Sequence, residues 1–230
     1  MWLLTLLSIA VIAEKCPGQY HFVMNKDATT PLTKRGHKRR QALLDAATDI
    51  FLEQGYAGTT LDMIIAHAGG SRRSLYDYFG DKEGLFAAVI TYHANKLVED
   101  IRRIDVEGLP AREGLTLLAS AFVESLIAPV HLALYRLLIT ESPSHPALGK
   151  TIYQVGPGLL LEQLDQYLDY LCQRGELPAE RRTPHTARQF LGMIKTDFQI
   201  CALLCPEQLP SPPQIQAHID ACVSLLLDNH

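Results

Sequence analysis

Two adjacent glycines, Gly69 and Gly70, divide the stretch TTLDMIIAHAGGSRRSLYDYF into two short segments. Each segment is preceded by residues that favour a helix N-terminus: Thr59 or Thr60 for the first, and Ser71 for the second. A capping box formed by Thr59 and Asp62 is one possibility, and a cap by Thr60 is the other. Because a glycine pair ends a helix and allows a tight turn, we expect two helices of about two turns each, joined at the glycines.

The preceding segment completes a three-helix unit. Between Lys38 and Gly55 the apolar residues recur at intervals of three and four, which predicts an amphipathic helix with Gly55 as its C-cap. A longer helix followed by two short ones around a tight turn predicts a helix-turn-helix. In the second short helix, Leu75 and Phe79 lie one turn apart and should face the preceding helices.

The opposite side of that helix carries side chains suited to nucleic acid. Guanidinium groups can bind guanine edges or phosphates, and hydroxyl and phenol groups can donate to phosphate oxygens. The residues on this side are Arg72, Arg73, Ser74, Tyr76 and Tyr78. Taken alone, the segment would also suit a small helical bundle with an ordinary polar surface.

Net charge agrees with a nucleic-acid partner only because it is unevenly distributed. The chain of 230 residues has a formal charge of −4, which by itself argues against binding a polyanion. Residues 84–230 hold 11 basic and 16 acidic side chains, whereas residues 34–83 hold 8 and 7. Basic residues cluster before the first helix, and Lys38 in this cluster is a predicted DNA contact.

The combined pattern resembles the DNA-binding segment of the tetracycline-repressor (TetR) family over residues 36–86. The matching positions are Thr59-Thr60, Ile65-Ala66, Leu75-Tyr76, Tyr78-Phe79, and Lys82 with Leu85. One departure is Gly70, where the family usually has valine. Because the missing side chain buries less apolar surface in the turn, it lowers stability by about 1 kcal/mol. It is also expected to loosen the second short helix.

The resemblance implies a role for each matched polar residue. The positions that match DNA-backbone contacts are Thr60, Tyr76, Tyr78 and Lys82. The positions that match base contacts are Arg72, Arg73 and Ser74. Double-stranded DNA is therefore the expected partner.

From Leu85 onward the sequence predicts successive amphipathic helices. The expected segments are a helix to about Arg103, 112–127, one beginning at Pro129, a region to Gly175 with a break at 156–158, 184–204 and 212–228. The expected fold class is all-α. Residues 36–83 form an N-terminal helix-turn-helix domain, and residues 84–230 form a C-terminal helical bundle for ligand binding and dimerisation.

The C-terminal part resembles the AefR-like subgroup of the same family, on the segments LYRLLITESPSHPALGKTIYQVGPG and FLGMIKTDFQICALL. This resemblance implies a homodimer through the last two helices, 184–204 and 212–228, and a palindromic operator. It also implies a small-molecule effector whose identity the sequence does not give. Aromatic or soft side chains are candidates to contact it, although each also suits an ordinary core: Phe122, Tyr135, Tyr153, Tyr167, Met193 and Phe198.

Residues 1–35 are expected to be an N-terminal extension followed by a flexible basic arm. The apolar run 2–13 is too short to span a bilayer as a helix, and neither a preceding basic residue nor a small-residue cleavage site accompanies it. Since Met24 begins a polar, basic leader, we expect translation to start there, without residues 1–23, and the protein to be cytoplasmic. A membrane anchor is the alternative.

The sequence lacks the motifs of enzymes. It has no G-x-S-x-G, H-E-x-x-H or G-x-G-x-x-G motif, no P-loop and no cysteine pair at metal-binding spacing. We therefore expect neither catalysis nor a cofactor nor a metal. The predicted function is a sequence-specific transcriptional regulator, a dimeric repressor that responds to a ligand. A membrane-anchored or purely protein-interacting helical module is the alternative.

Overall fold

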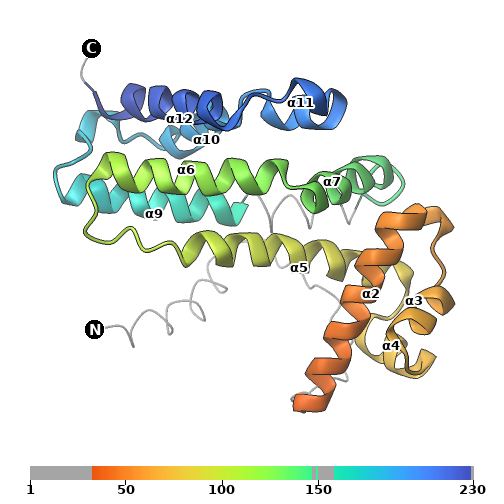
Figure 1. Ribbon diagram of the computed structural model, residues 1–230. Coiled ribbons are helices and arrows are strands. Elements are labelled where there is room, and N and C mark those ends of the chain that lie inside the picture. The colour runs from red at the N-terminus through yellow and green to blue at the C-terminus, as the bar shows by residue number, and fades with distance from the viewer. Residues whose placement is uncertain (1–32, 147–148, 150–157, 229–230) are drawn as a thin grey trace. The chain divides into compact units, whose positions relative to one another are not determined.

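The structure, a computed structural model, describes residues 33–146, 149 and 158–228 (Figure 1). These residues form helices and connecting turns, and no strand occurs among them. They belong to two compact units that divide between Arg39 and Arg40. The predictions for residues 1–32, for Tyr153 and for a break at residues 156–157 fall outside the described residues.

The first unit is described only from residue 33 to residue 39. Here Thr33 begins helix α2 (Lys34–Gly58), four residues before the expected start at Lys38. The Thr33 hydroxyl accepts a hydrogen bond from the backbone N–H of Gly36 at 3.1 Å, and its carbonyl accepts one from His37 at 3.0 Å. Lys38 is exposed in this part of α2.

The predicted helix-turn-helix is present, with α3 (Leu61–Ala68) and α4 (Arg72–Phe79) following α2 (Figure 1). Thr60 caps α3 by accepting from the N–H of Met63 at 3.3 Å. Ser71 caps α4 by accepting from the N–H of Ser74 at the same distance, 3.3 Å. These hydrogen bonds confirm the caps expected at Thr60 and Ser71.

The capping box expected from Thr59 is wrong. This side chain is buried, and its hydroxyl donates to the carbonyl of Gly55 at 2.7 Å, so it closes the end of the preceding helix instead. Gly55 has a φ of 70°, which confirms a helix end there, although the helical assignment extends to Gly58. Gly69 and Gly70 also have positive φ values of 68° and 110° in the turn before α4.

One apolar core holds α2, α3, α4 and the beginning of α5 (Lys82–Arg102) together. Leu75 is fully buried and Phe79 nearly so, as their spacing predicted. In the same core the rings of Phe51 and Phe86 meet edge to face with centroids 5.0 Å apart, which joins α2 to α5.

Gly84 brings α4 and α5 into close contact. Asp81 caps α5 by accepting from the N–H of Gly84 at 2.7 Å. A Cβ atom at Gly84 would overlap with the backbone carbonyl oxygen of Phe79, the last residue of α4. Helix α4 therefore ends directly against the first turn of α5, where only a glycine fits.

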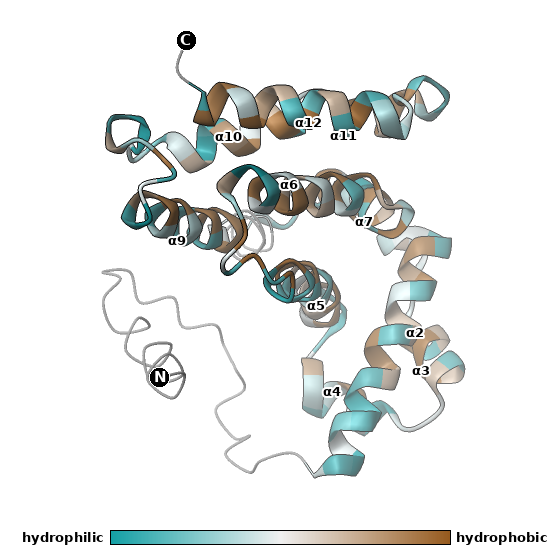
Figure 2. Ribbon diagram, turned by 60° about the vertical axis from the view of Figure 1, so that its left-hand side comes forward, coloured by the Kyte–Doolittle hydropathy of each residue, from teal (hydrophilic) through white to brown (hydrophobic). Residues whose placement is uncertain are grey.

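The remaining helices are α6 (Ala111–Ile127), α7 (Pro129–Glu141), α9 (Leu159–Gln173), α10 (Thr186–Lys195), α11 (Phe198–Leu204) and α12 (Pro212–Leu227), with short 3-10 turns at Ala179–Arg181 and Pro206–Gln208. Helices α6, α9, α10, α11 and α12 form a second core, whereas Leu134 of α7 is buried in the first. Helices α10 and α12 pack on α6, and α5 packs against α6 and α9. Figure 2 shows hydrophobic residues on the sides of α6 and α9 that approach one another.

The single helix expected over 184–204 is wrong, because the structure has two helices there. Helix α10 ends at Lys195, and α11 begins at Phe198. Between them Thr196 has a φ of 34°, a backbone conformation that a β-branched residue rarely adopts. The expected dimerisation segment is therefore divided into two helices.

No single helix within the described ranges is both long and apolar enough to cross a membrane. Helices α6 and α7 pass such a test only as a pair, by length and composition, and they are bent by 61° relative to each other. The apolar run 2–13 lies outside the described residues, so this finding does not cover it.

Candidate nucleic-acid interface and ligand cavity

The outward face of α4 presents Arg73 and Tyr76 to solvent. The Arg73 side chain is 91% exposed, and Tyr76 is 48% exposed. Arg73 Nε lies 3.8 Å from a carboxylate oxygen of Asp77, one turn further along the same helix. Such an exposed pair holds a side chain only weakly, so Arg73 is free to bind another partner. The apolar side of α4 meanwhile lies in the core.

Arg72 is oriented by an ion pair. Its Nε donates to Oδ1 of Asp62 at 2.8 Å, and its Nη2 contacts the other carboxylate oxygen. This two-point pair joins the first turn of α4 to the first turn of α3, and both side chains remain mostly exposed. Sequence reasoning missed the pair, because it assigned Asp62 only to helix capping.

Lys82 is held by the protein rather than pointing freely into solvent. Its Nζ lies 4.5 Å from the ring centroid of Tyr56 and donates to the carbonyl of Ala57 at 3.4 Å. Burial lowers the pKa of Lys82, while nearby Glu141 opposes that shift. This ammonium group therefore lies beside α2, at the start of α5.

Thr60, Ser74 and Tyr78 already have contacts within the domain. Thr60 caps α3, and the Ser74 hydroxyl lies 3.1 Å from that of Ser71. Tyr78 is half-buried against the neighbouring ring of Phe79, at a centroid distance of 6.1 Å. Contacts from these three to DNA remain predictions.

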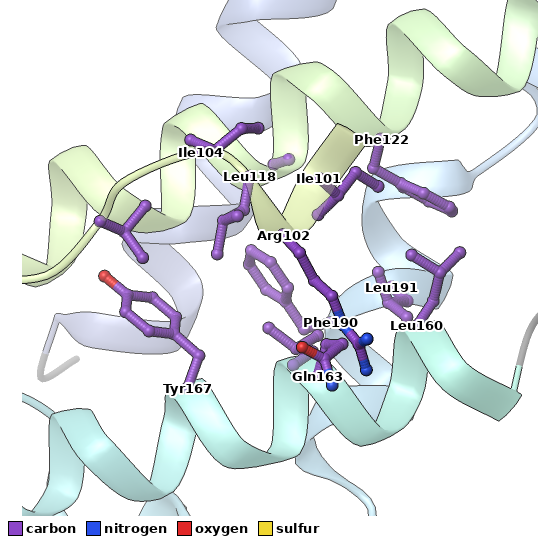
Figure 3. A pocket seen from close by; sticks show the side chains of 13 residues that line it. Ile101, Arg102, Ile104, Leu118, Phe122, Leu160, Gln163, Tyr167, Phe190 and Leu191 are labelled. Atoms are coloured by element: carbon purple, nitrogen blue, oxygen red, sulfur yellow. The ribbon is translucent and has the colours of Figure 1, made fainter. Parts of the chain in front are cut away.

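A cavity of about 170 Å³ lies between the end of α5 and helices α6, α9 and α10 (Figure 3). Its wall is mostly apolar and includes Leu118, Phe122, Leu160, Phe190 and Leu191. Three polar side chains also line it: Arg102, Gln163 and Tyr167. A mostly apolar wall with few polar groups is typical of small-molecule sites.

Two of the predicted effector contacts line this cavity: Phe122 and Tyr167. The structure places three others elsewhere: Tyr135, Met193 and Phe198. Phe198 is buried in the core of the C-terminal helices, and Met193 packs against the same core. Tyr135 lies on α7, which contributes no residue to the cavity.

Comparison with known families decides the classification. The family described as "Bacterial regulatory proteins, tetR family" matches residues 43–89. The family described as "AefR-like transcriptional repressor, C-terminal domain" matches residues 113–229, about half of the chain. The chain belongs to the TetR family. It is a DNA-binding transcriptional regulator and not an enzyme.

TetR-family relatives match along most of their length. The HTH-type transcriptional regulator YezE of Bacillus subtilis (strain 168) is 26% identical over 195 residues, covering 80% of this chain and 94% of YezE. A TetR-family regulator from Mesorhizobium loti MAFF303099 superposes with a TM-score of 0.76 at 26% identity, covering 84% of this chain and 97% of that one. The flavonoid-responsive regulator FrrA gives a TM-score of 0.67 at 28% identity, with coverages of 83% and 95%.

Two of the three polar residues of the cavity, Arg102 and Gln163, were missed by sequence reasoning about this TetR-family chain. For Gln163 a signal was available, since it lies one turn before Tyr167 on the apolar stripe of α9. A polar residue inside an apolar stripe often marks a ligand-binding or catalytic site. Arg102 gave no such signal, because its position depends on where α5 ends relative to α9.

Proposed function

We propose that this TetR-family regulator is a ligand-responsive repressor that binds a palindromic operator as a homodimer. The observation that carries the proposal is the division of α4 into a buried side with Leu75 and an exposed side with Arg73 and Tyr76. One short helix contacts few base pairs. A twofold dimer places two of them about 34 Å apart, one turn of DNA, and so increases affinity and specificity.

Base recognition falls to the first turn of α4. Arg72 and Arg73 can reach guanine edges in the major groove, with Ser74 beside them. Polar side chains near α4 contact phosphates: Thr60, Tyr76, Tyr78 and Lys82. Lys38, in the first unit, is a further proposed phosphate contact. For Lys82, binding to phosphate exchanges its contacts with Tyr56 and Ala57 for contact with DNA.

Selection of operators from random duplexes tests the proposal. We expect a palindromic consensus, and anisotropy titrations should show an affinity that falls steeply as salt rises, because bound phosphates release counterions. Failure to bind any duplex in a salt-dependent manner would contradict the proposed function.

A first prediction concerns the ion pair of Arg72 and Asp62. Asp62→Asn removes a carboxylate from the DNA-facing surface and frees Arg72 from its two-point contact. We expect binding to random DNA to strengthen several-fold, and the ratio of operator to random affinity to fall. Competition titrations measure that ratio. A variant with the Asp77→Asn substitution, which breaks only the weak pair with Arg73, is the matched control.

The dimer is proposed to form through α10, α11 and α12. The outward side of α12 combines small exposed residues, Ala217 and Ala221, with Leu225, which is 55% exposed. On α10, Gly192 is also exposed. Small side chains allow helices of two subunits to approach closely, and an exposed leucine adds apolar area to the interface.

A second prediction tests this surface. Ala221→Arg is expected to shift the protein from dimer to monomer, because a long charged side chain separates the two subunits' helices. Sedimentation velocity at micromolar concentration measures the change, and operator affinity should fall with it. Gln173→Arg, which adds the same charge to an exposed position on α9, should leave the dimer intact. A dimeric Ala221→Arg variant would rule out α12 as the interface.

Ligand response is proposed because α5 belongs to both parts of the fold. Its first turns carry Leu85 and Phe86, which are buried with α2, α3 and α4, while its last turn carries Ile101 and Arg102 at the cavity. A ligand that binds one position of α5 better than another shifts the population of DNA-binding conformations. FrrA, a similar protein of known structure, is a flavonoid-responsive regulator, which supports a responsive cavity here.

A further inference from the structure

We propose that the effector is a compact aromatic carboxylate with a single ring. Its carboxylate binds Arg102 and Gln163, and its ring lies among the apolar and aromatic side chains of the wall. This inference rests on the proposed function, since it gives the chemical class of ligand for the proposed effector cavity.

The volume of the cavity limits the size of the ligand. A cavity of roughly 150 Å³ holds one benzene molecule, whereas drug-sized ligands occupy sites of about 300–1,000 Å³. The cavity here measures about 170 Å³. This volume is close to that of one substituted ring and smaller than the sites typical of drug-sized ligands.

The wall favours an aromatic ring over a flexible chain. Phe122 on α6 and Phe190 on α10 contribute two aromatic side chains, and Leu118, Leu160 and Leu191 fill the remaining wall (Figure 3). Aromatic pairs gain about 0.5–1.5 kcal/mol beyond their buried area when their geometry is favourable. A rigid ring also loses less conformational entropy on binding than an alkyl chain.

Arg102 and Gln163 provide the site for an anion. Arg102 extends from the last turn of α5 toward Gln163 on α9 (Figure 3). Within the described ranges neither side chain has a hydrogen bond or ion pair, whereas neighbouring Arg103 lies 3.7 Å from a carboxylate oxygen of Asp100. An unpaired planar guanidinium beside an amide N–H₂ matches the two oxygens of a carboxylate.

Tyr167 contributes its ring, and not its hydroxyl, to the wall of the cavity. Its hydroxyl oxygen is buried and has no hydrogen-bond partner among the described residues. It lies against Gly114 of α6, where a Cβ atom would overlap with it, so an acceptor on a ligand in the cavity does not reach it. Burial, together with Glu176, raises the pKa of Tyr167 to about 12, so the phenol keeps its proton.

Isothermal titration calorimetry of the full chain without DNA tests the ligand class. The probe is 4-hydroxybenzoate, compared with neutral 4-hydroxybenzamide, ring-free hexanoate and the flavonoid naringenin. We expect 4-hydroxybenzoate to bind at least tenfold more tightly than each of the other three. Equal or tighter binding of the amide, of hexanoate or of naringenin would overturn the proposal, and so would no binding of 4-hydroxybenzoate.

Variants then test the anion site. Arg102→Ala should weaken 4-hydroxybenzoate binding at least tenfold and leave the weaker 4-hydroxybenzamide affinity nearly unchanged. Arg103→Ala, its neighbour outside the cavity lining, should leave both affinities unchanged. Tyr167→Phe should also leave both affinities nearly unchanged, because the hydroxyl does not reach the ligand. Equal effects of Arg102→Ala and Arg103→Ala would contradict the proposed anion site.

The proposed function is tested separately, with the selected operator. If the operator is bound but 4-hydroxybenzoate never releases it, regulation through this cavity fails even where calorimetry supports the ligand class. If no operator is found, the DNA-binding proposal fails, and calorimetry still decides which chemical class the cavity accepts.

Discussion

Arg73→Ala is expected to lower the affinity for the selected operator by roughly 10- to 100-fold, the range expected when a two-point contact to a base is lost. The affinity for random duplex DNA should fall much less, so that discrimination among sequences is reduced. The reason is that the Arg73 side chain is 91% exposed at the start of α4 and only weakly paired. Anisotropy titrations with the operator and with single-base variants of it measure both quantities.

Two variants separate base reading from phosphate binding. Tyr76→Phe removes one hydroxyl and should weaken binding to all duplexes about equally. Arg103→Ala removes an exposed, ion-paired arginine at the far end of α5 and should change nothing. If Arg73→Ala also weakens operator and random DNA by the same factor, Arg73 binds phosphate and the base-reading assignment is wrong.

Gly84→Ala is expected to abolish operator binding and to lower the stability of the helix-turn-helix. The added methyl group overlaps with the carbonyl oxygen of Phe79, and a backbone atom cannot move aside as a flexible side chain can. Overpacking of this kind destabilises a protein by about 1–3 kcal/mol. Thermal unfolding measures the loss of stability, and anisotropy measures the loss of operator binding.

Gly58→Ala provides the matched control. A Cβ atom at Gly58 would meet only the Cβ of Gln54, at an ordinary distance of 3.6 Å, near the end of α2. This substitution should leave the protein equally stable or slightly more stable, because alanine restricts the unfolded chain. An unchanged operator affinity for Gly84→Ala would show that the α4–α5 contact does not set the position of α4.

The parts of the fold that sequence predicted well depend on local interactions. The caps at Thr60 and Ser71, and the burial of Leu75 and Phe79, follow from the hydrogen-bonding capacity and the spacing of residues close in the chain. Helix type and order along the chain were predictable for the same reason. The ends of α2 were less predictable, because Thr33 caps a helix that begins at Lys34, four residues before the expected start.

The features that the sequence failed to predict involve contacts between residues distant in the chain. An unbroken apolar pattern concealed the break at Thr196, whose φ of 34° depends on how α10 and α11 pack on other helices. The pair of Arg72 with Asp62 joins two helices across a turn, and the cavity joins segments from four helices. Hydrophobic periodicity shows which side of a helix is buried, but not which partner it meets.

Gly70 illustrates how a family comparison can mislead. The absence of the usual valine suggested a loosely packed turn. In the structure Gly70 has a φ of 110°, a conformation that a β-branched residue cannot adopt without strain. The turn of this chain therefore follows a backbone path that requires glycine.

The length of α5 converts small displacements into larger ones. Its 21 residues extend over roughly 30 Å, from the close contact between Gly84 and the end of α4 to the guanidinium of Arg102. For a rigid rod of this length, a tilt of about 5° moves the far end by about 2–3 Å. An atom-scale rearrangement around one benzene-sized molecule would thus be enough to take α4 out of register with the base pairs that we propose it contacts.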